Sequence, residues 1–164
     1  MRYLLNMFVA LFCSACGWHL QGATHLPTAL ASIRIDSSDE YTDFYRELKR
    51  SLTASGVATS EQAGSARAVL RVHQDKAGER VAAVSPRNTP EEFQVFYAID
   101  YSVAVDGVEV APTEHLELTT NYSYDSSAVL GKEHEQRTIQ QALARELANI
   151  VLRRLSTVQI QATH

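Results

Sequence analysis

The sequence predicts an α+β fold, a two-layer sandwich in which two helices pack on one face of a mainly antiparallel four-stranded sheet. Three observations carry this prediction. Apolar and polar residues alternate without a break along residues 93–105, which is the period of a strand. Asp106-Gly107 follows at once and is typical of a tight hairpin turn. Residues 41–52 and 139–155 instead carry apolar residues at helical spacing. The expected element order is therefore β-α-β-β-β-α.

The N-terminal part of the fold is expected to be one strand and one helix. Residues 32–36 alternate and predict a short strand. Ser37 and Glu40 have the spacing of a capping box, which places the start of the helix directly after that strand. Gly56 is a typical stop at the C-terminus of a helix. The apolar stripe expected between these signals consists of Tyr41, Phe44, Tyr45, Leu48 and Leu52.

Three strands are expected in the middle of the chain. The first runs over residues 68–75 and 80–85, and residues 76–79 between them allow a turn or a bulge. The second, residues 93–105, is roughly 40 Å long at about 3.3 Å per residue, which is well above the usual strand length. Beyond the hairpin turn, the return strand is expected over residues 108–124. A loop bounded by Pro86 and Pro90 joins the first two strands.

The last element is expected to be a long amphipathic helix that begins at Lys132 or Glu133 and ends at Leu155. A polar tail follows it. The apolar stripe of this helix comprises Ile139, Leu143, Leu147, Ile150, Val151 and Leu155, and its opposite side carries Arg137, Gln141, Arg145, Asn149 and Arg153.

The N-terminus has the layout of a secretory signal. Arg2 gives a positive start, residues 3–12 are mostly apolar, and the small residues Ser14 and Ala15 precede Cys16. The apolar run is shorter than the about 20 residues of a transmembrane helix. A cysteine directly after small residues resembles the lipobox of bacterial lipoproteins, in which the signal is cut before the cysteine and the cysteine is lipidated.

This signal predicts how the chain is divided. Residues 1–15 are the expected lipoprotein signal peptide, residues 16–31 the lipidated Cys16 and its tether, residues 32–157 the α+β domain, and residues 158–164 the tail. Each acyl methylene buried in a bilayer contributes about 0.8 kcal/mol, so several chains on Cys16 would hold the domain firmly at a membrane. The mature chain would keep one cysteine and no internal disulfide, so its core must hold it together.

Two other interpretations of these residues stay open. An ordinary signal peptide cut near Ala15 would leave Cys16 without a lipid. Cys13 and Cys16 also have the Cys-x-x-Cys spacing of redox motifs, which is disfavoured because Cys13 lies in the segment to be removed. Cys13 also departs from the lipobox pattern, since it stands where Leu is usual.

Composition argues against several classes of function. The formal net charge of −4 disfavours a nucleic-acid partner. The six histidines are scattered and none pairs with another at helical metal-ligand spacing, so we expect neither a metal site nor a cofactor. No nucleophile elbow or paired acid motif organises the serines, histidines and acids, so the protein is not expected to be an enzyme.

Motifs at both ends of the chain resemble one family. Cys16-Gly17-Trp18-His19-Leu20 looks like the start of the mature lipopolysaccharide-assembly lipoprotein family, LptE. Leu26-Pro27 and Ile35-Asp36-Ser37 fit the first strand of that family, and residues 128–136 with the helix after them resemble its C-terminal half. The likeness spans nearly the whole domain in its order of elements. It is close in residues only at the two ends. Gly17 after the cysteine, by the same resemblance, favours export to the outer membrane.

The resemblance implies a function without covalent chemistry. Members of this family sit as a plug inside a very large outer-membrane β-barrel, LptD. They help that barrel assemble and assist the insertion of lipopolysaccharide into the outer leaflet. The chain would then be an outer-membrane lipoprotein on the periplasmic side, anchored by acyl chains on Cys16. The family is also thought to bind lipopolysaccharide through basic residues, and the matching positions are Arg87 and Lys132.

The chemistry of these two residues suits that role. Lipid A presents phosphates, which arginine binds with paired hydrogen bonds and lysine as a compact charge. Lys132 stands where the last helix is expected to begin, near free backbone N–H groups and the positive end of the helix dipole. The alternative is that Arg87 is an exposed loop arginine and Lys132 a solvated lysine. Arg71, His73 and Arg80 would extend a basic strip if their strands are neighbours.

A different function with the same N-terminal signal also stays open. The chain would then be another outer-membrane lipoprotein, acting as an envelope-assembly scaffold or binding module unrelated to lipopolysaccharide. Co-purification distinguishes the two, because only the first is expected to come out with a single large barrel protein.

Overall fold

The structure is a computed structural model, and it describes residues 26–60, 66–123 and 129–158. Cys16 with its signal and most of the tether lie outside the described residues, as does nearly all of the tail, so the expectations for them stay predictions. The elements are a 3-10 turn η1 (Thr28–Leu30), β1 (Ser32–Ser37), α2 (Asp43–Ala54), β2 (Ala58–Thr59), β3 (Ala68–Val84), β4 (Pro90–Val105), β5 (Val108–Ser123) and α3 (Val129–Thr157).

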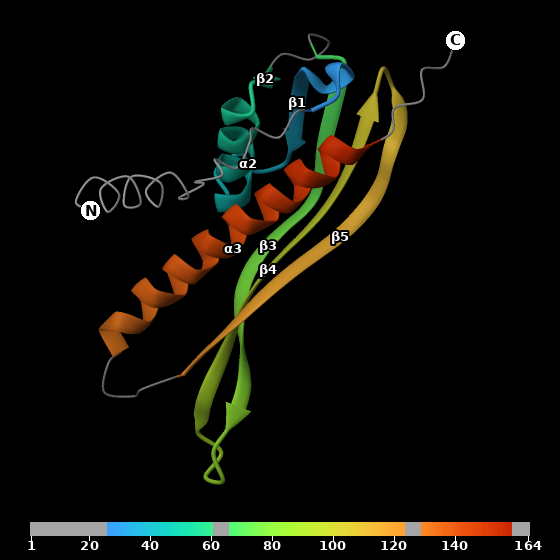
Figure 1. The fold of residues 1–164 in the computed structure, drawn as a ribbon. Helices are drawn as coiled ribbons and strands as arrows, with labels where there is room; N and C mark the ends of the chain where they lie inside the picture. Colours follow the sequence, from blue (N-terminus) through green and yellow to red (C-terminus); the bar gives the residue numbers. More distant parts are fainter. Residues whose placement is uncertain (1–25, 61–65, 124–128, 159–164) are drawn as a thin grey trace, which may run out of the picture.

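The α+β class is confirmed, with two helices on one side of a single sheet. Figure 1 shows β3, β4 and β5 as long twisted strands, with α3 crossing them obliquely and α2 beside it. One core joins the layers. It contains Phe44, Leu48 and Leu52 of α2, Leu147 and Val151 of α3, and the inward side chains of the sheet.

The prediction of a four-stranded, mainly antiparallel sheet was wrong in two respects. The sheet has five strands in the order β2-β1-β3-β4-β5, and it is mixed. β1 pairs in parallel with both β2 and β3, whereas β3, β4 and β5 are antiparallel to one another. α2 is the crossover between β1 and β2, because two parallel neighbouring strands cannot be joined by a tight turn. β2 has only two residues, too few to show any periodicity.

The predicted capping box at Ser37 and Glu40 was also wrong. Ser37 belongs to β1, where it pairs with Val72 of β3, and α2 begins at Asp43. Thr42 caps the helix instead, because its side chain accepts a hydrogen bond from the backbone N–H of Tyr45 at 3.1 Å. Tyr41 therefore precedes the helix and is 85% exposed, outside the predicted apolar stripe.

The end of α2 agrees with the prediction. The helix ends at Ala54, and Gly56 adopts a φ of 80°, a conformation that glycine takes without steric cost.

The third strand runs unbroken through the segment expected to turn or bulge. Lys76 pairs with Ala98 and Gly78 with Phe96, both inside β3. The register shifts lie on either side of this segment, between Val72 and Gln74 and again between Val81 and Val84. Gly78 has a steric reason to be glycine, since a Cβ there would lie 2.8 Å from the Phe96 ring.

The long hairpin of β4 and β5 is confirmed. Asp106 and Gly107 adopt φ values of 51° and 82°, the positive pair that a type I′ turn needs. On β4 the side chains of Val95, Tyr97, Ile99, Tyr101, Val103 and Val105 are all buried. They face the helices, as the alternation predicts.

The last helix is longer than predicted, and it packs on the core mainly through its second half, with Ile139 partly buried before it. It begins at Val129 rather than Lys132 or Glu133, and it ends at Thr157 rather than Leu155. Its buried residues start at Leu143. The first half therefore projects beyond the core. No helix in the described part of the chain is both long and apolar enough to cross a membrane.

Candidate functional site

One end of the molecule carries the two residues that the sequence singled out. In Figure 1 the β3–β4 loop, with Arg87, lies at the bottom of the molecule, and the start of α3, with Lys132, lies at the lower left, to one side of the strands. β5 also ends there, because Ser123 pairs with Glu92 of β4. Val129 follows Ser123 by six residues, which at about 3.5 Å per residue keeps the two within about 20 Å. We call this end, formed by residues 79–94 and the first half of α3, the tip end.

The side chain of Ser85 organises the β3–β4 loop. Its hydroxyl oxygen accepts hydrogen bonds from the backbone N–H groups of Arg87, at 3.3 Å, and Thr89, at 3.2 Å. The backbone closes the same turn, since Ser85 N–H donates to the Thr89 carbonyl at 2.8 Å and Asn88 N–H donates to the Ser85 carbonyl at 2.9 Å. Asn88 takes a φ of 60°, which asparagine tolerates. The loop therefore presents Arg87 from a defined turn.

The guanidinium of Arg87 is exposed and has no carboxylate within 4.0 Å among the described residues. Of the described arginines, only Arg137 on α3 shares this condition. The others form ion pairs with Asp or Glu: Arg34, Arg46, Arg50, Arg67, Arg71, Arg80, Arg145, Arg153 and Arg154. The arginines without an acidic partner are therefore both at the tip end.

Lys132 lies in the first turn of α3, and the structure describes only its backbone. In a first turn the backbone N–H groups lack intrahelical acceptors, and the helix dipole is positive. The backbone of Lys132 therefore lies in the first turn of the last helix, close to the predicted start. The site role of Arg87 and Lys132 stays a prediction.

The sequence predicts that Arg137 lies on the polar side of the last helix, but it assigns this residue no role in a site. Glu133 precedes it by four residues, a spacing that favours an ion pair. In the structure both side chains are exposed and do not form that pair. No sequence signal distinguishes Arg137 from Arg145 or Arg153, which do find partners.

The possible basic strip is present on one strand but is largely neutralised. Arg71, His73 and Arg80 all lie on β3, on the face opposite the helices. Arg71 pairs with Asp36 at 3.2 Å, and Arg80 pairs with Glu117 at 3.0 Å. Arg80 also lies over the Phe96 ring, 5.4 Å from its centroid. The Nε2 atom of His73 lies 2.8 Å from the Ser102 hydroxyl. These side chains hold the sheet face together and leave little free positive charge.

Acidic residues accompany the cations at the tip end. Glu91 and Glu92 are exposed at the start of β4, next to the Arg87 loop. Their carboxylates repel an anion that approaches Arg87. Salt weakens this repulsion, because exposed charges more than about 10 Å apart are largely screened. The tip end is thus a surface of mixed charge, on which Arg87 lies at the apex of the hairpin.

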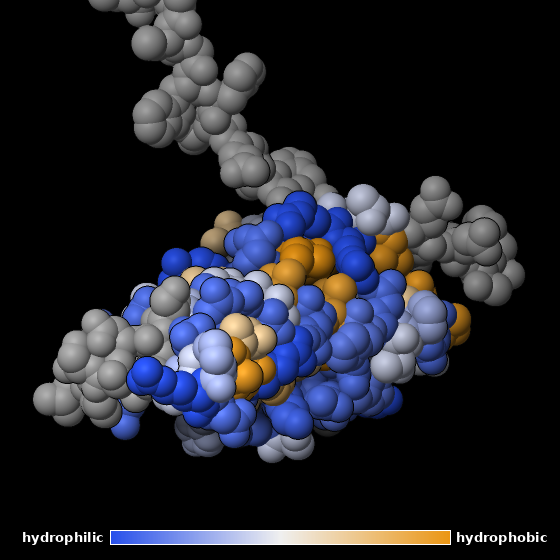
Figure 2. Space-filling view, turned by 90° about the horizontal axis from the view of Figure 1, so that it is seen from below, coloured by the Kyte–Doolittle hydropathy of each residue, from blue (hydrophilic) through white to orange (hydrophobic). Residues whose placement is uncertain are grey.

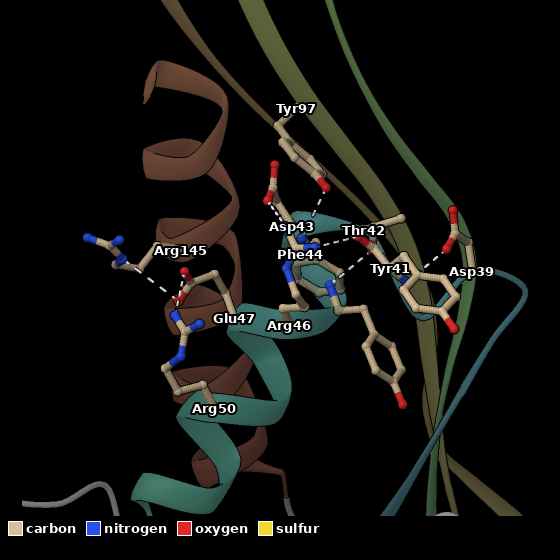
Figure 3. A network of polar contacts seen from close by, with 11 residues as sticks. Asp39, Tyr41, Thr42, Asp43, Phe44, Arg46, Glu47, Arg50, Tyr97 and Arg145 are labelled. Atoms are coloured by element: carbon tan, nitrogen blue, oxygen red, sulfur yellow. Dashed lines mark hydrogen bonds and ion pairs between the residues drawn. The ribbon is translucent and has the colours of Figure 1, made fainter. Parts of the chain in front are cut away.

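A second polar cluster fixes α2 against the sheet. Figure 3 shows the Tyr97 hydroxyl pointing at the N-terminus of α2, where it accepts a hydrogen bond from Phe44 N–H at 3.1 Å. Glu47 lies between Arg50, at 2.7 Å, and Arg145 of α3, at 3.8 Å. These contacts connect β4, α2 and α3, so we assign the cluster a structural role.

Burial raises the pKa of two groups in this cluster. The pKa of the Asp75 carboxyl is raised, first by burial and then by repulsion from Asp39 and Asp43; Thr42 and Tyr97 beside it oppose part of that shift. Its Oδ2 atom is buried without a hydrogen-bond partner. Burial also raises the pKa of the Tyr97 hydroxyl well above its ordinary value. Both groups lie where α2 meets the sheet, and we assign them the same structural role.

A third cluster fixes the far end of α3. The Tyr101 hydroxyl donates a hydrogen bond to Glu114 at 3.0 Å, and Arg154 forms an ion pair with the same carboxylate. Burial and the nearby carboxylate raise the pKa of Tyr101 to about 12. These contacts connect β4, β5 and the C-terminal part of α3. Across residues 26–60, 66–123 and 129–158, no three His, Cys, Asp or Glu side chains gather as a metal site would require.

Comparison with known proteins extends the picture to related chains. The chain is 26% identical over 153 residues to the "LPS-assembly lipoprotein LptE" of Pectobacterium atrosepticum, covering 90% of this chain and 80% of the relative. It is 24% identical over 156 residues to the protein of the same name from Yersinia pestis, covering 94% and 75%.

Solved structures with a similar fold carry lipoprotein names. An uncharacterized lipoprotein B from Nitrosomonas europaea matches with a TM-score of 0.72 at 17% identity, covering 85% of this chain and 90% of the other. The rare lipoprotein B from Shewanella oneidensis matches with a TM-score of 0.67 at 23% identity, covering 77% and 94%. At these identities the likeness supports the fold alone.

The family model described as "LptE: Lipopolysaccharide-assembly" matches residues 30–155, from η1 to the last turns of α3. This match includes the mixed sheet, both helices and the whole tip end. The chain belongs to the LptE family of lipopolysaccharide-assembly lipoproteins.

Proposed function

We propose that this protein is an outer-membrane lipoprotein that plugs and helps assemble an LptD-like β-barrel, and that binds lipopolysaccharide through Arg87 and Lys132 during its insertion into the outer leaflet. The family supports the general role, since its relatives are named for lipopolysaccharide assembly. Acyl chains on Cys16 would hold the domain at the periplasmic side of the membrane. The function needs no catalytic residue and no cofactor.

The observation that carries the lipopolysaccharide-binding part is the state of the Arg87 side chain. Arg87 is exposed at a turn fixed by Ser85 and has no acidic partner in the described structure. An arginine already paired with a carboxylate must give up that pair before it binds a phosphate, whereas Arg87 need not. Lys132 adds a cation at a helix N-terminus, and Arg137 adds another about one and a half turns further along α3.

Charge reversal tests this part directly. We expect Arg87→Glu and Lys132→Glu each to weaken lipopolysaccharide binding by roughly tenfold or more, because each removes a charge-assisted contact and adds repulsion. Lys76→Glu is the matched control, since Lys76 is exposed on β3 and lies nine residues before Ser85, about 30 Å from the Arg87 loop along the strand. Circular dichroism should show all three variants folded. Equal affinity in Arg87→Glu, Lys132→Glu and the wild type would rule out the assignment.

The barrel and the anchor need a separate experiment. The full-length protein, extracted in mild detergent, is expected to co-purify with one large outer-membrane barrel protein, identified by mass spectrometry. Labelled palmitate should appear on Cys16 and be lost in Cys16→Ala. Recovery of several unrelated envelope proteins, without a dominant barrel, would instead favour the envelope-assembly scaffold.

A further inference from the structure

Exposed apolar side chains flank the Arg87 loop. Val81 is 50% exposed and Val84 is 53% exposed, and both belong to the uncharged run Val81-Ala82-Ala83-Val84 at the end of β3. In the described part of the chain, the other large hydrophobic residues so exposed are Tyr41 and Val108, far from this loop in the sequence. Two of the three exposed valines in the described part of the chain, Val81 and Val84, thus lie within the six residues before Arg87.

The strand partners of these valines enlarge the apolar surface. Val81 pairs with Phe93 and Val84 with Pro90 across β3 and β4. The Phe93 ring stacks on Tyr122 of β5 with ring centroids 5.8 Å apart, so it is held in place. Figure 2 views the molecule from this end and shows hydrophobic residues grouped among hydrophilic ones. The tip end therefore offers fixed apolar side chains next to cations.

No other described strand pairs with the hairpin beyond Glu92, although Tyr122 of β5 covers one side of the Phe93 ring. β1 pairs with β3 only from Ala68 to Val72, and β5 reaches no further than Glu92 of β4. The buried residues of α3 begin at Leu143, in the half of the helix away from the tip. Apolar surface left open by a fold is a common mark of a binding site.

We infer that Val81, Val84 and Phe93 form a contact for the acyl chains of the same anionic lipid whose phosphates bind at Arg87. This inference rests on the proposed function and adds the ligand part that the cations do not explain. An anionic lipid has its phosphates and its chains at fixed relative positions. A cation in the loop and apolar side chains on the two strands beside it can bind both parts of such a lipid. A free phosphate or a phosphorylated sugar would contact only the cation.

Charge complementarity favours a lipid over a second copy of this chain. A second copy would bring another Arg87 against the first, and like charges across an interface are unfavourable. A protein surface with an apolar patch and a carboxylate is the other candidate occupant. The experiment below separates it from a lipid, because the two predict different losses in the same variants.

The test compares two ligands on the full-length protein. One is detergent-dispersed lipopolysaccharide, and the other is the same molecule fully deacylated with its phosphates kept. The variant is Val81→Thr/Val84→Thr, since threonine keeps the β-branched shape and replaces one methyl group with a hydroxyl. Val108→Thr is the matched control, because Val108 is 61% exposed at the opposite end of β5. Thermal melting checks that each variant is folded.

We expect the wild type to bind the acylated ligand at least about tenfold more tightly than the deacylated one, and the double variant to lose most of that difference. Val108→Thr should behave as the wild type. Equal wild-type affinity for the two ligands would overturn this inference and leave the proposed function standing. No measurable binding of either ligand would instead contradict the proposed function. If the double variant binds lipopolysaccharide normally but loses its barrel partner, the valines contact protein and the inference is wrong.

Discussion

The hydroxyl oxygen of Tyr97, on β4, accepts a hydrogen bond from the backbone N–H of Phe44 at the start of α2, with 3.1 Å between the two atoms. The two residues are 53 positions apart in the chain. The first backbone N–H groups of a helix have no partner inside the helix, so one is satisfied here by a strand side chain. This bond fixes the position of α2 over the sheet.

Tyr97→Phe should therefore destabilise the domain without changing its shape. The Phe44 N–H would stay buried without an acceptor, which costs about 1–3 kcal/mol. Urea unfolding followed by circular dichroism measures the change. Tyr41→Phe is the control, since Tyr41 is 85% exposed, and its stability should equal that of the wild type. Equal losses in the two variants would show that the Tyr97 hydroxyl does not cap α2.

The stability of the domain should depend on the protonation of Asp75. Burial raises the pKa of this carboxyl in the folded state, so the folded protein binds the proton more tightly than the unfolded chain. That contribution is fully present below the unfolded pKa, about 3.9, and is lost as the pH rises through the folded pKa. Unfolding free energies of the wild type and Asp75→Asn, compared across this range, should diverge as the pH rises, with the wild type losing more. Parallel curves would contradict the prediction.

Gly78→Ala should strain the open face of the sheet. The new Cβ would lie 2.8 Å from the tip of the Phe96 ring, so this ring, over which Arg80 lies, must shift. Overpacking of this kind costs about 1–3 kcal/mol. In a double-mutant cycle with Phe96→Leu, the alanine should cost clearly less, because the shorter side chain leaves room. A cycle with no coupling energy would mean that Gly78 is not required by Phe96.

Removing acidic charge at the tip end should strengthen lipopolysaccharide binding. Glu91 and Glu92 are exposed next to the Arg87 loop, and they repel a phosphate that approaches Arg87. We expect Glu91→Gln/Glu92→Gln to bind lipopolysaccharide severalfold more tightly at low ionic strength, and the gain to shrink at high ionic strength. Glu109→Gln, an exposed acid near the opposite turn, is the control. A gain that does not respond to salt would have a different cause.

Strict periodicity made the long strands and the packed half of α3 predictable. Residues 93–105 alternate without a break, and Asp106-Gly107 is a dipeptide strongly preferred in tight hairpin turns. The start of α2 was missed because Ser37 has the local signature of a cap but takes part in parallel pairing with β3. A local motif cannot show which distant segment a strand will pair with. β2 could not be predicted either, because its two residues are too few to show a period.

The candidate site was predictable only in part. Arg87 and Lys132 came from a family resemblance; the structure places Arg87 in the β3–β4 loop and Lys132 in the first turn of α3, and their role stays a prediction. The sequence could not show that Arg71 and Arg80 are neutralised by Asp36 and Glu117, since those acids come from other strands. Nor could it separate Arg137 from the paired arginines of the same helix. Which charges remain free depends on side chains brought together only by folding.

The most direct test of the central claim is site-specific photo-crosslinking at position 87 in living cells. A photoreactive amino acid in place of Arg87 should crosslink to lipopolysaccharide while the molecule is being transported, and the same group in place of Lys76 should not. Both proteins must reach the membrane at normal levels, which immunoblotting checks. Lipopolysaccharide adducts at position 87 and none at position 76 are the predicted result. Adducts at both positions, or at neither, would contradict the claim that the tip end binds lipopolysaccharide.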